Sequence, residues 1–211
     1  MGIGALQTTS NGTDYAGYAT TGNQRIDNFY SGLSSAVEKS DSKAEGDALG
    51  LTTIKYTDSI SYGMAAFYSS DSTGEDPIIR VSSNYGGEQR YYDVHVNDVD
   101  PKNASQLEMF ALSSYTDDKG ITNSGTYGSF SRMKVYESNA ADNGYGVDLQ
   151  NPDNASAKLD WISVLKNMAG EYLQNSQTYS QYLDCNKLAS QLENWRNVNI
   201  GNKVTATNDE K

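Results

Sequence analysis

The sequence predicts an α+β fold, in which C-terminal helices pack on one face of a small antiparallel meander sheet of three or four strands. Two observations carry this prediction. Between residues 59 and 97, apolar and polar side chains alternate, which is the period of a strand buried on one side. After Asp100, apolar residues recur every three or four positions, which is the period of an amphipathic helix. Strands followed by helices in separate runs are typical of the α+β class.

Three stretches have the character of strands. The first covers residues 59–70, the second residues 77–83 and the third residues 88–97. The seven residues 71–77 are turn material, and Asn84-Tyr85-Gly86-Gly87 offers residues that accept the positive φ of a hairpin turn. We therefore expect consecutive hairpins with one half-solvated face.

Four helices are expected after the strands. Ser105 and Glu108 have the spacing of a capping box, in which the two residues satisfy each other's backbone amides, and Gly120 ends that helix. A second, shorter helix follows around residues 130–136 and ends at Asn143-Gly144. The third helix carries Leu159 to Leu173 and has Asn154 or Ser156 as its expected N-cap; the fourth runs from Tyr182 to Trp195.

The chain divides into three parts. We expect residues 1–48 to be a mostly disordered N-terminal segment, because Ser, Thr, Asn, Gly and charged residues dominate it. Residues 49–200 are expected to form a single α+β domain, and residues 201–211 a flexible tail. One short amphipathic helix is predicted within the first segment, over residues 26–37, with apolar positions Ile26, Phe29, Tyr30, Leu33 and Val37.

One segment resembles a known family. The run Asp100-Pro101-Lys102-Asn103-Ala104 leads into Glu108-Met109-Phe110-Ala111-Leu112 and follows a strand with Tyr62-Gly63-Met64. These residues are similar to a family of uncharacterised bacterial proteins, over roughly residues 59–195. The resemblance implies a bacterial source and an ordered core between variable ends. It implies no activity, cofactor or catalytic residue.

Composition excludes several classes of function. The 211 residues hold one histidine, one cysteine and a net charge of −11, so a Cys/His metal cluster or a His-rich metal site is ruled out. Because nucleic acids and anionic membranes are bound largely through Lys and Arg, we expect neither as a partner. No stretch approaches the about 20 apolar residues that cross a membrane, so we expect no membrane insertion. The N-terminus has no signal-peptide pattern, which predicts a cytoplasmic protein unless a leader has been removed or another export signal is used.

Groups that could support catalysis are few. His95 and Asp93 share a strand face, but no nucleophile motif accompanies them. Cys185 lies beside Asp184, whose charge raises rather than lowers the pKa of a thiol. The run Asp142–Asp148, with Asp153, offers oxygen ligands without the EF-hand order. We expect no catalytic residue, no metal and no cofactor.

Tyrosine is the one positive signal, with 16 in the chain. Several fall on the predicted meander, where they either pack under the helices in place of missing Leu and Val or form a recognition surface. The leading hypothesis is a non-enzymatic bacterial interaction module, cell-associated or exported, that binds a protein or a glycan through a tyrosine-lined sheet face. The alternative is an acidic-site hydrolase such as a carboxylate-pair glycosidase. The candidate ligand-binding residues are Tyr62, Tyr68, Tyr85, Tyr91 and Tyr92.

Overall fold

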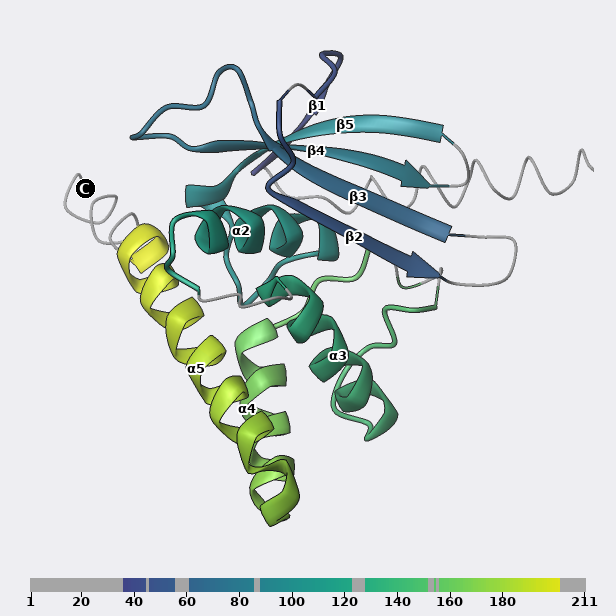
Figure 1. The fold of residues 1–211 in the computed structure, drawn as a ribbon, viewed down its shortest axis with the longest axis vertical. Helices are drawn as coiled ribbons and strands as arrows, with labels where there is room; N and C mark the ends of the chain where they lie inside the picture. Colours follow the sequence, from purple (N-terminus) through teal and green to yellow (C-terminus); the bar gives the residue numbers. More distant parts are fainter. Residues whose placement is uncertain are drawn as a thin grey trace, which may run out of the picture.

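The computed structural model describes residues 36–44, 46–55, 61–85, 88–122, 128–151, 154 and 156–201. These residues form an α+β unit, in which a five-stranded antiparallel sheet has four α-helices on one side (Figure 1). The predicted fold class is confirmed, but the sheet has five strands instead of three or four. The elements are β1 (Val37–Ser40), β2 (Gly50–Lys55), β3 (Ser61–Tyr68), β4 (Ile78–Tyr85), β5 (Glu88–His95), α2 (Gln106–Asp118), α3 (Ser129–Asp142), α4 (Trp161–Leu173) and α5 (Tyr179–Arg196).

The three predicted strands are β3, β4 and β5, and they pair in chain order as consecutive antiparallel neighbours. Their apolar residues line up across the register, since Ala66 lies opposite Val81 and Val81 opposite Tyr92. All three side chains are buried on the side that faces α2, as are Met64 and Val94. The predicted alternation therefore does fix which face of the meander enters the core.

The two edge strands, β1 and β2, were not predicted. The sheet order is β1-β5-β4-β3-β2, so these two sequence neighbours lie at opposite edges. Val37 pairs with Val94 and packs against the core as part of a strand, not of the helix predicted over residues 26–37. The sheet thus begins within the segment 1–48 that was expected to be mostly disordered. Residues 1–35, which hold the rest of that helix, lie outside the described residues.

The chain that joins β1 to β2 crosses the outer face of the sheet (Figure 1). Its Lys43 carbonyl accepts a hydrogen bond of 3.4 Å from Arg80, a β4 residue that is only 5% exposed. The Arg80 guanidinium also donates to both Asp93 oxygens, at 2.8 and 2.7 Å, and to the Ser69 hydroxyl at 3.0 Å. The centre of the outer face is therefore covered, where the sequence analysis expected a half-solvated face.

Helix α2 lies directly beneath the sheet, between it and the pair α4 and α5 (Figure 1). It is buried nearly all round, because its polar Gln106 and Glu108 are each 1% exposed. A helix in this position needs no single apolar stripe. Strand β2 approaches α2 closely at Gly50, where an added Cβ would lie 2.6 Å from the Ser114 hydroxyl. The apolar residues that α2 contributes to the core are Leu107, Met109, Phe110, Ala111 and Leu112.

Helix starts and ends follow the sequence, with one correction. The capping box of α2 is present, since Ser105 N donates to Glu108 at 2.7 Å and Glu108 N donates to Ser105 at 3.4 Å. Gly120 and Gly144 follow α2 and α3 with φ of +68° and +79°, as the predicted stops require. Helix α4 starts later than predicted, because Asp160, not Asn154 or Ser156, accepts from the amide of its first turn.

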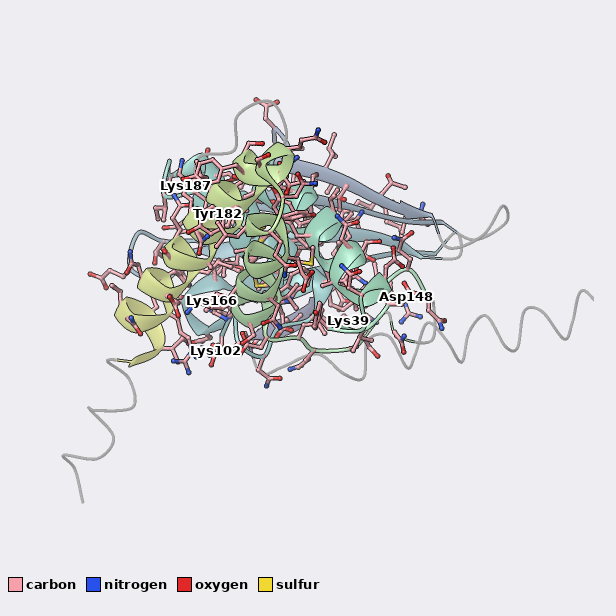
Figure 2. The ribbon with its side chains drawn as sticks, turned by 90° about the horizontal axis from the view of Figure 1, so that it is seen from below. Lys39, Lys102, Asp148, Lys166, Tyr182 and Lys187 are labelled. Carbon is pink, nitrogen blue, oxygen red and sulfur yellow. The ribbon has the colours of Figure 1, made fainter. Side chains whose placement is uncertain are left out.

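The helices of the described part carry no apolar stretch long enough to cross a membrane. Figure 2 looks onto the helical side, where Lys166 of α4 and Tyr182 and Lys187 of α5 are labelled. Of the predicted tail 201–211, only Gly201 falls within the described residues.

Candidate functional site

A groove of about 560 Å³ lies where the end of α5 meets the β3–β4 loop and the short helix η1 (Val96–Asp98). We call it the aromatic groove. A smaller hollow of about 280 Å³ adjoins it, since Gly74, Pro77 and Tyr115 line both. The groove is lined by Gly74, Glu75, Pro77, Asn97, Tyr115, Ile121, Gln191, Asn194, Trp195, Val198 and Asn199.

Three aromatic rings from distant parts of the chain form the floor of this region. Tyr115 of α2 packs edge to face against Trp195 of α5, with ring centroids 5.9 Å apart. On its other side Tyr115 meets Tyr68 of β3 at 6.4 Å, again edge to face. Such contacts hold the rings in fixed orientations. The groove is thus built on a rigid aromatic series that links the sheet to the last helix.

Two charged residues, Asp118 and Lys119, lie at the Tyr68 end of this series. The Tyr68 hydroxyl donates to Asp118 at 2.6 Å, and burial followed by the Asp118 carboxylate raises the pKa of Tyr68. Lys119 Nζ lies 5.2 Å from the centre of the Tyr68 ring and 5.7 Å from that of Tyr115. The tyrosine therefore remains a protonated donor at neutral pH. Lys119 makes cation–π contacts with both rings.

Amide side chains make the walls polar. Gln191 donates to the Ile121 carbonyl at 2.6 Å, Asn97 to the Glu75 carbonyl at 2.9 Å and Asn199 to the Trp195 carbonyl at 3.0 Å. Each bond uses the amide nitrogen and fixes the orientation of the side chain. The amide oxygens are acceptors. The wall therefore carries preoriented acceptors.

Two polar atoms of the groove residues have no hydrogen-bond partner among the described residues. They are the indole nitrogen of Trp195 and the amide oxygen of Gln191, and both atoms are buried. The two residues are four positions apart on α5, so they share one face of the helix. A buried polar group without a partner costs about 1–3 kcal/mol. Trp195 and Gln191 thus line the groove, and each carries a buried atom without a partner, one a donor and the other an acceptor.

The end of α5 also shapes the rim. The helix passes into a π-helical turn over Asn197–Gly201, a wider turn that often occurs at functional sites. This turn brings Val198 and Asn199 to the groove. Val198 is 64% exposed, and Ile121 from the end of α2 is 41% exposed. The rim is apolar and accessible, while the walls are polar.

The predicted tyrosines do not share one surface. Tyr92 is 3% exposed and belongs to the core, so it cannot contact a ligand here. Tyr91 alternates with it and faces the opposite side of the sheet. Tyr68 lines the hollow beside the aromatic groove. Tyr62 and Tyr85 are register partners in β3 and β4, and their side chains lie outside the described part. The described members therefore form no tyrosine-lined sheet face.

Sequence reasoning missed Tyr115, Gln191 and Trp195 as site residues. Tyr115 and Trp195 both pack with the core, as aromatic residues of helices commonly do. Gln191 carried no signal, because an amide on a helix surface is ordinary. No local pattern in the sequence connects the three.

The candidates for acid–base and thiol chemistry, His95, Asp93 and Cys185, have structural roles. His95 Nδ1 lies 2.9 Å from Asp76, and the neighbouring Asp93 is engaged by Arg80 instead. The Asp93–His95 contact considered from the sequence is therefore not formed. Cys185 is fully buried, and burial followed by Asp184 raises the pKa of its thiol to about 12. A thiol in that environment is a packing residue.

Carboxylates do not converge in the groove, where Glu75 is the acidic residue among the described lining residues. Glu137 of α3 is 2% exposed, and burial raises its pKa to about 7, but it lines none of the hollows described here. In the predicted ligand run 142–148, Asp148 accepts from the amide of Gln150 at 2.9 Å in a local turn. No group of three or more His, Cys, Asp or Glu residues suited to a metal ion occurs in the described part of the chain.

Comparisons of this chain with protein-family models, with curated proteins and with solved structures find no match. The resemblance of residues 59–195 to an uncharacterised bacterial family therefore stays a prediction.

Proposed function

We propose that this chain is a non-enzymatic binding module that takes a hydroxyl-rich glycan into the aromatic groove. The observation that carries the proposal is the pair of unsatisfied atoms on α5, Trp195 Nε1 and Gln191 Oε1. The first is a donor and the second an acceptor. Both atoms are buried in residues that line the groove, so a ligand that satisfies them has to displace these side chains slightly, accept a hydrogen bond from Trp195 and donate one to Gln191.

A sugar hydroxyl has both capacities in one group. Its oxygen accepts from an indole N–H while its proton is donated to an amide oxygen. An ammonium or guanidinium group only donates, so it would leave Trp195 unsatisfied. The fixed amides Asn97 and Asn199 offer further acceptors along the wall, as successive hydroxyls require. This combination favours a glycan over a basic peptide.

The same geometry favours binding over hydrolysis. Carboxylate-pair glycosidases need two carboxyl groups about 5–10 Å apart on either side of the bond that is cleaved. The described lining of the groove offers Glu75 alone. Glu137 has the raised pKa of a general acid, yet its carboxyl is buried away from the groove. The acidic-site hydrolase therefore remains the second candidate.

The proposal is tested with neutral homo-oligosaccharides of glucose, xylose and N-acetylglucosamine, titrated against the full chain. The two tryptophans simplify the readout, because Trp161 is fully buried and Trp195 lines the groove. We expect at least one series to change the tryptophan fluorescence in a saturable way. Trp195→Phe should abolish that change and weaken binding, as measured by calorimetry, by about tenfold or more.

Tyr179→Phe is the matched control, since Tyr179 is an exposed aromatic residue at the other end of α5. It should bind as the unmodified chain does. If none of the oligosaccharides binds, or if Trp195→Phe binds them unchanged, the groove is not a glycan site. Release of reducing ends during the titration would support the hydrolase instead.

A further inference from the structure

A second groove lies on the opposite edge of the molecule, between strand β2 and helix α3. It encloses about 520 Å³, and Figure 1 shows α3 beneath β2 at this edge. Val135 on its helical wall is 58% exposed and Leu51 on its strand wall is 73% exposed. A further hollow of about 460 Å³, lined by Tyr136 and Tyr172, continues past Val135. We call the first of these the edge groove.

The strand wall of the edge groove offers unpaired backbone. In the described sheet β2 pairs with β3 alone, so no other described strand pairs with its outer side. The Thr53 carbonyl accepts a hydrogen bond of 3.0 Å from Lys134 of α3, and from this bond we infer that the backbone of Thr53 faces away from β3. Alternation along an antiparallel strand points the backbone of Leu51 the same way. An extended segment could therefore pair here as an additional strand.

Lys134 determines what kind of strand fits. It is the one charged residue among the described residues that line the edge groove, in a chain of net charge −11. Its ammonium donates to the Thr53 carbonyl, which is the acceptor that an N–H of an incoming strand would use. Lysines at sheet edges commonly prevent strand pairing in this way. A strand that displaces Lys134 must supply a new partner for it. A carboxylate does so with a charge-assisted hydrogen bond.

We propose that the edge groove binds an extended peptide segment of another protein, which adds to β2 as a further strand and pairs its own carboxylate with Lys134. Apolar side chains of that segment cover Leu51 and Val135. This interaction is separate from glycan binding, because the aromatic groove lies at the far end of α5 and shares no lining residue with the edge groove.

Charge complementarity selects this occupant over a second copy of the chain. If β2 paired with β2 of another copy, the segment Gly50–Lys55 of that copy would lie beside Lys134. This segment contains a lysine and no acidic residue. Lys134 would then lose its bond to Thr53 without gaining a partner. A peptide with an acidic side chain or a free C-terminus avoids that loss.

The test begins with a displayed library of random dodecapeptides, selected on the immobilised full chain. Enriched peptides are synthesised and their affinity is measured by fluorescence anisotropy. We expect extended, apolar sequences with one carboxylate, and replacement of that carboxylate by an amide should weaken binding by about tenfold. Lys134→Met should weaken binding by a similar factor, while Lys166→Met on α4, which loses only an exposed pair with Glu193, should not.

Two further variants test the strand addition. Thr53→Pro blocks pairing at the edge and costs no bond to β3, because the Thr53 backbone points outward. Leu51→Asn removes apolar contact at a side chain exposed enough to leave folding intact, and Leu173→Asn at 55% exposure is its control. Both edge variants should lose binding. The proposal is overturned if no peptide is enriched, if peptides bind Thr53→Pro unchanged, or if light scattering shows a dimer that Thr53→Pro dissociates.

Discussion

Trp161 and Trp195 are both buried, yet they differ in what their indole N–H groups meet. Trp161 is 0% exposed and donates to the Ala104 carbonyl at 2.8 Å. Trp195 is 9% exposed, and its Nε1 has no partner among the described residues. The first tryptophan ties the start of α4 to the segment before α2. The second lines a groove and leaves a donor unused.

The regions around the two tryptophans differ in the same way. At the start of α2, Ser105 and Glu108 bond each other and Gln106 donates to the Leu149 carbonyl at 3.3 Å. At the end of α5, Gln191 has an unsatisfied oxygen beside Trp195. Buried polar groups that satisfy one another stabilise the fold. Buried polar groups without a partner need an explanation, and for those of the groove residues we propose a ligand.

The largest effect that separates the two regions is expected from tryptophan substitution. Trp161→Phe should lower the free energy of unfolding by about 2–4 kcal/mol, because it removes buried volume and leaves the Ala104 carbonyl without its donor. Trp195→Phe removes a donor that has no partner and should cost about 1 kcal/mol or less. Urea denaturation followed by circular dichroism measures both. Equal losses would mean that the two indoles play the same structural role.

Glu137 sharpens the comparison, because its Oε1 is buried and unsatisfied but lies beside neither groove. Burial raises its pKa from the usual 4.5 to about 7. The folded chain therefore binds the proton more tightly than the unfolded chain, and this contribution to stability is lost as the pH rises from about 4.5 through about 7.

Glu137→Gln should consequently be more stable than the unmodified chain at pH 8, by up to about 3 kcal/mol, and equally stable at pH 4. Denaturation at several pH values measures the difference, with the exposed Glu38→Gln as the control. Glycan binding should not change. A loss of binding would mean that unsatisfied groups outside the groove also serve the ligand.

The capping box lies in the region whose buried polar groups have partners, and its loss should lower the free energy of unfolding by a smaller amount. Ser105→Ala should cost about 0.5–2 kcal/mol, since the Glu108 amide loses its partner in a buried position. Thermal unfolding measures this, with the exposed Ser180→Ala on α5 as control. Binding at low temperature should stay intact. Full stability combined with lost binding would make the Asp100–Leu112 segment a functional site.

The smallest effect on stability is expected at Gln191. Gln191→Leu removes the unsatisfied oxygen and also the solvent-exposed hydrogen bond to the Ile121 carbonyl. Because these two losses act in opposite directions, the free energy of unfolding should change by about 0.5 kcal/mol. Glycan affinity should nevertheless fall by about tenfold. A variant that binds normally would show that this oxygen does not meet the ligand.

Most of the core fold could be predicted from the sequence, because it is encoded locally. Alternation identified β3 to β5, and the Ser105/Glu108 spacing and the glycines at 120 and 144 located helix ends. Strand β1 was missed because Val-Glu-Lys-Ser has one apolar residue, which is enough at a sheet edge but too few for a pattern. The N-cap at Asp160 was missed because Asn154 and Ser156 also match the preference.

The candidate site could not be predicted in this way. Tyr68, Tyr115 and Trp195 come from β3, α2 and α5, and only the tertiary fold brings them together. Nothing local distinguishes an indole whose N–H is satisfied from one that is not. Tyr92 shows the converse, because a tyrosine expected at a surface fills core volume in a chain poor in leucine and valine.

The sheet order also dictates a sequence of assembly. Strands β2 to β5 join by local hairpins, which close early because little chain has to be ordered between them. Strand β1 must find β5 from a distant part of the chain, and it carries with it the crossover that shields Arg80. Amide hydrogens of β1 should therefore exchange with solvent before those of β3 and β4. On this prediction, detachment of β1 exposes the Arg80–Asp93 pair to water before the meander and α2 unfold.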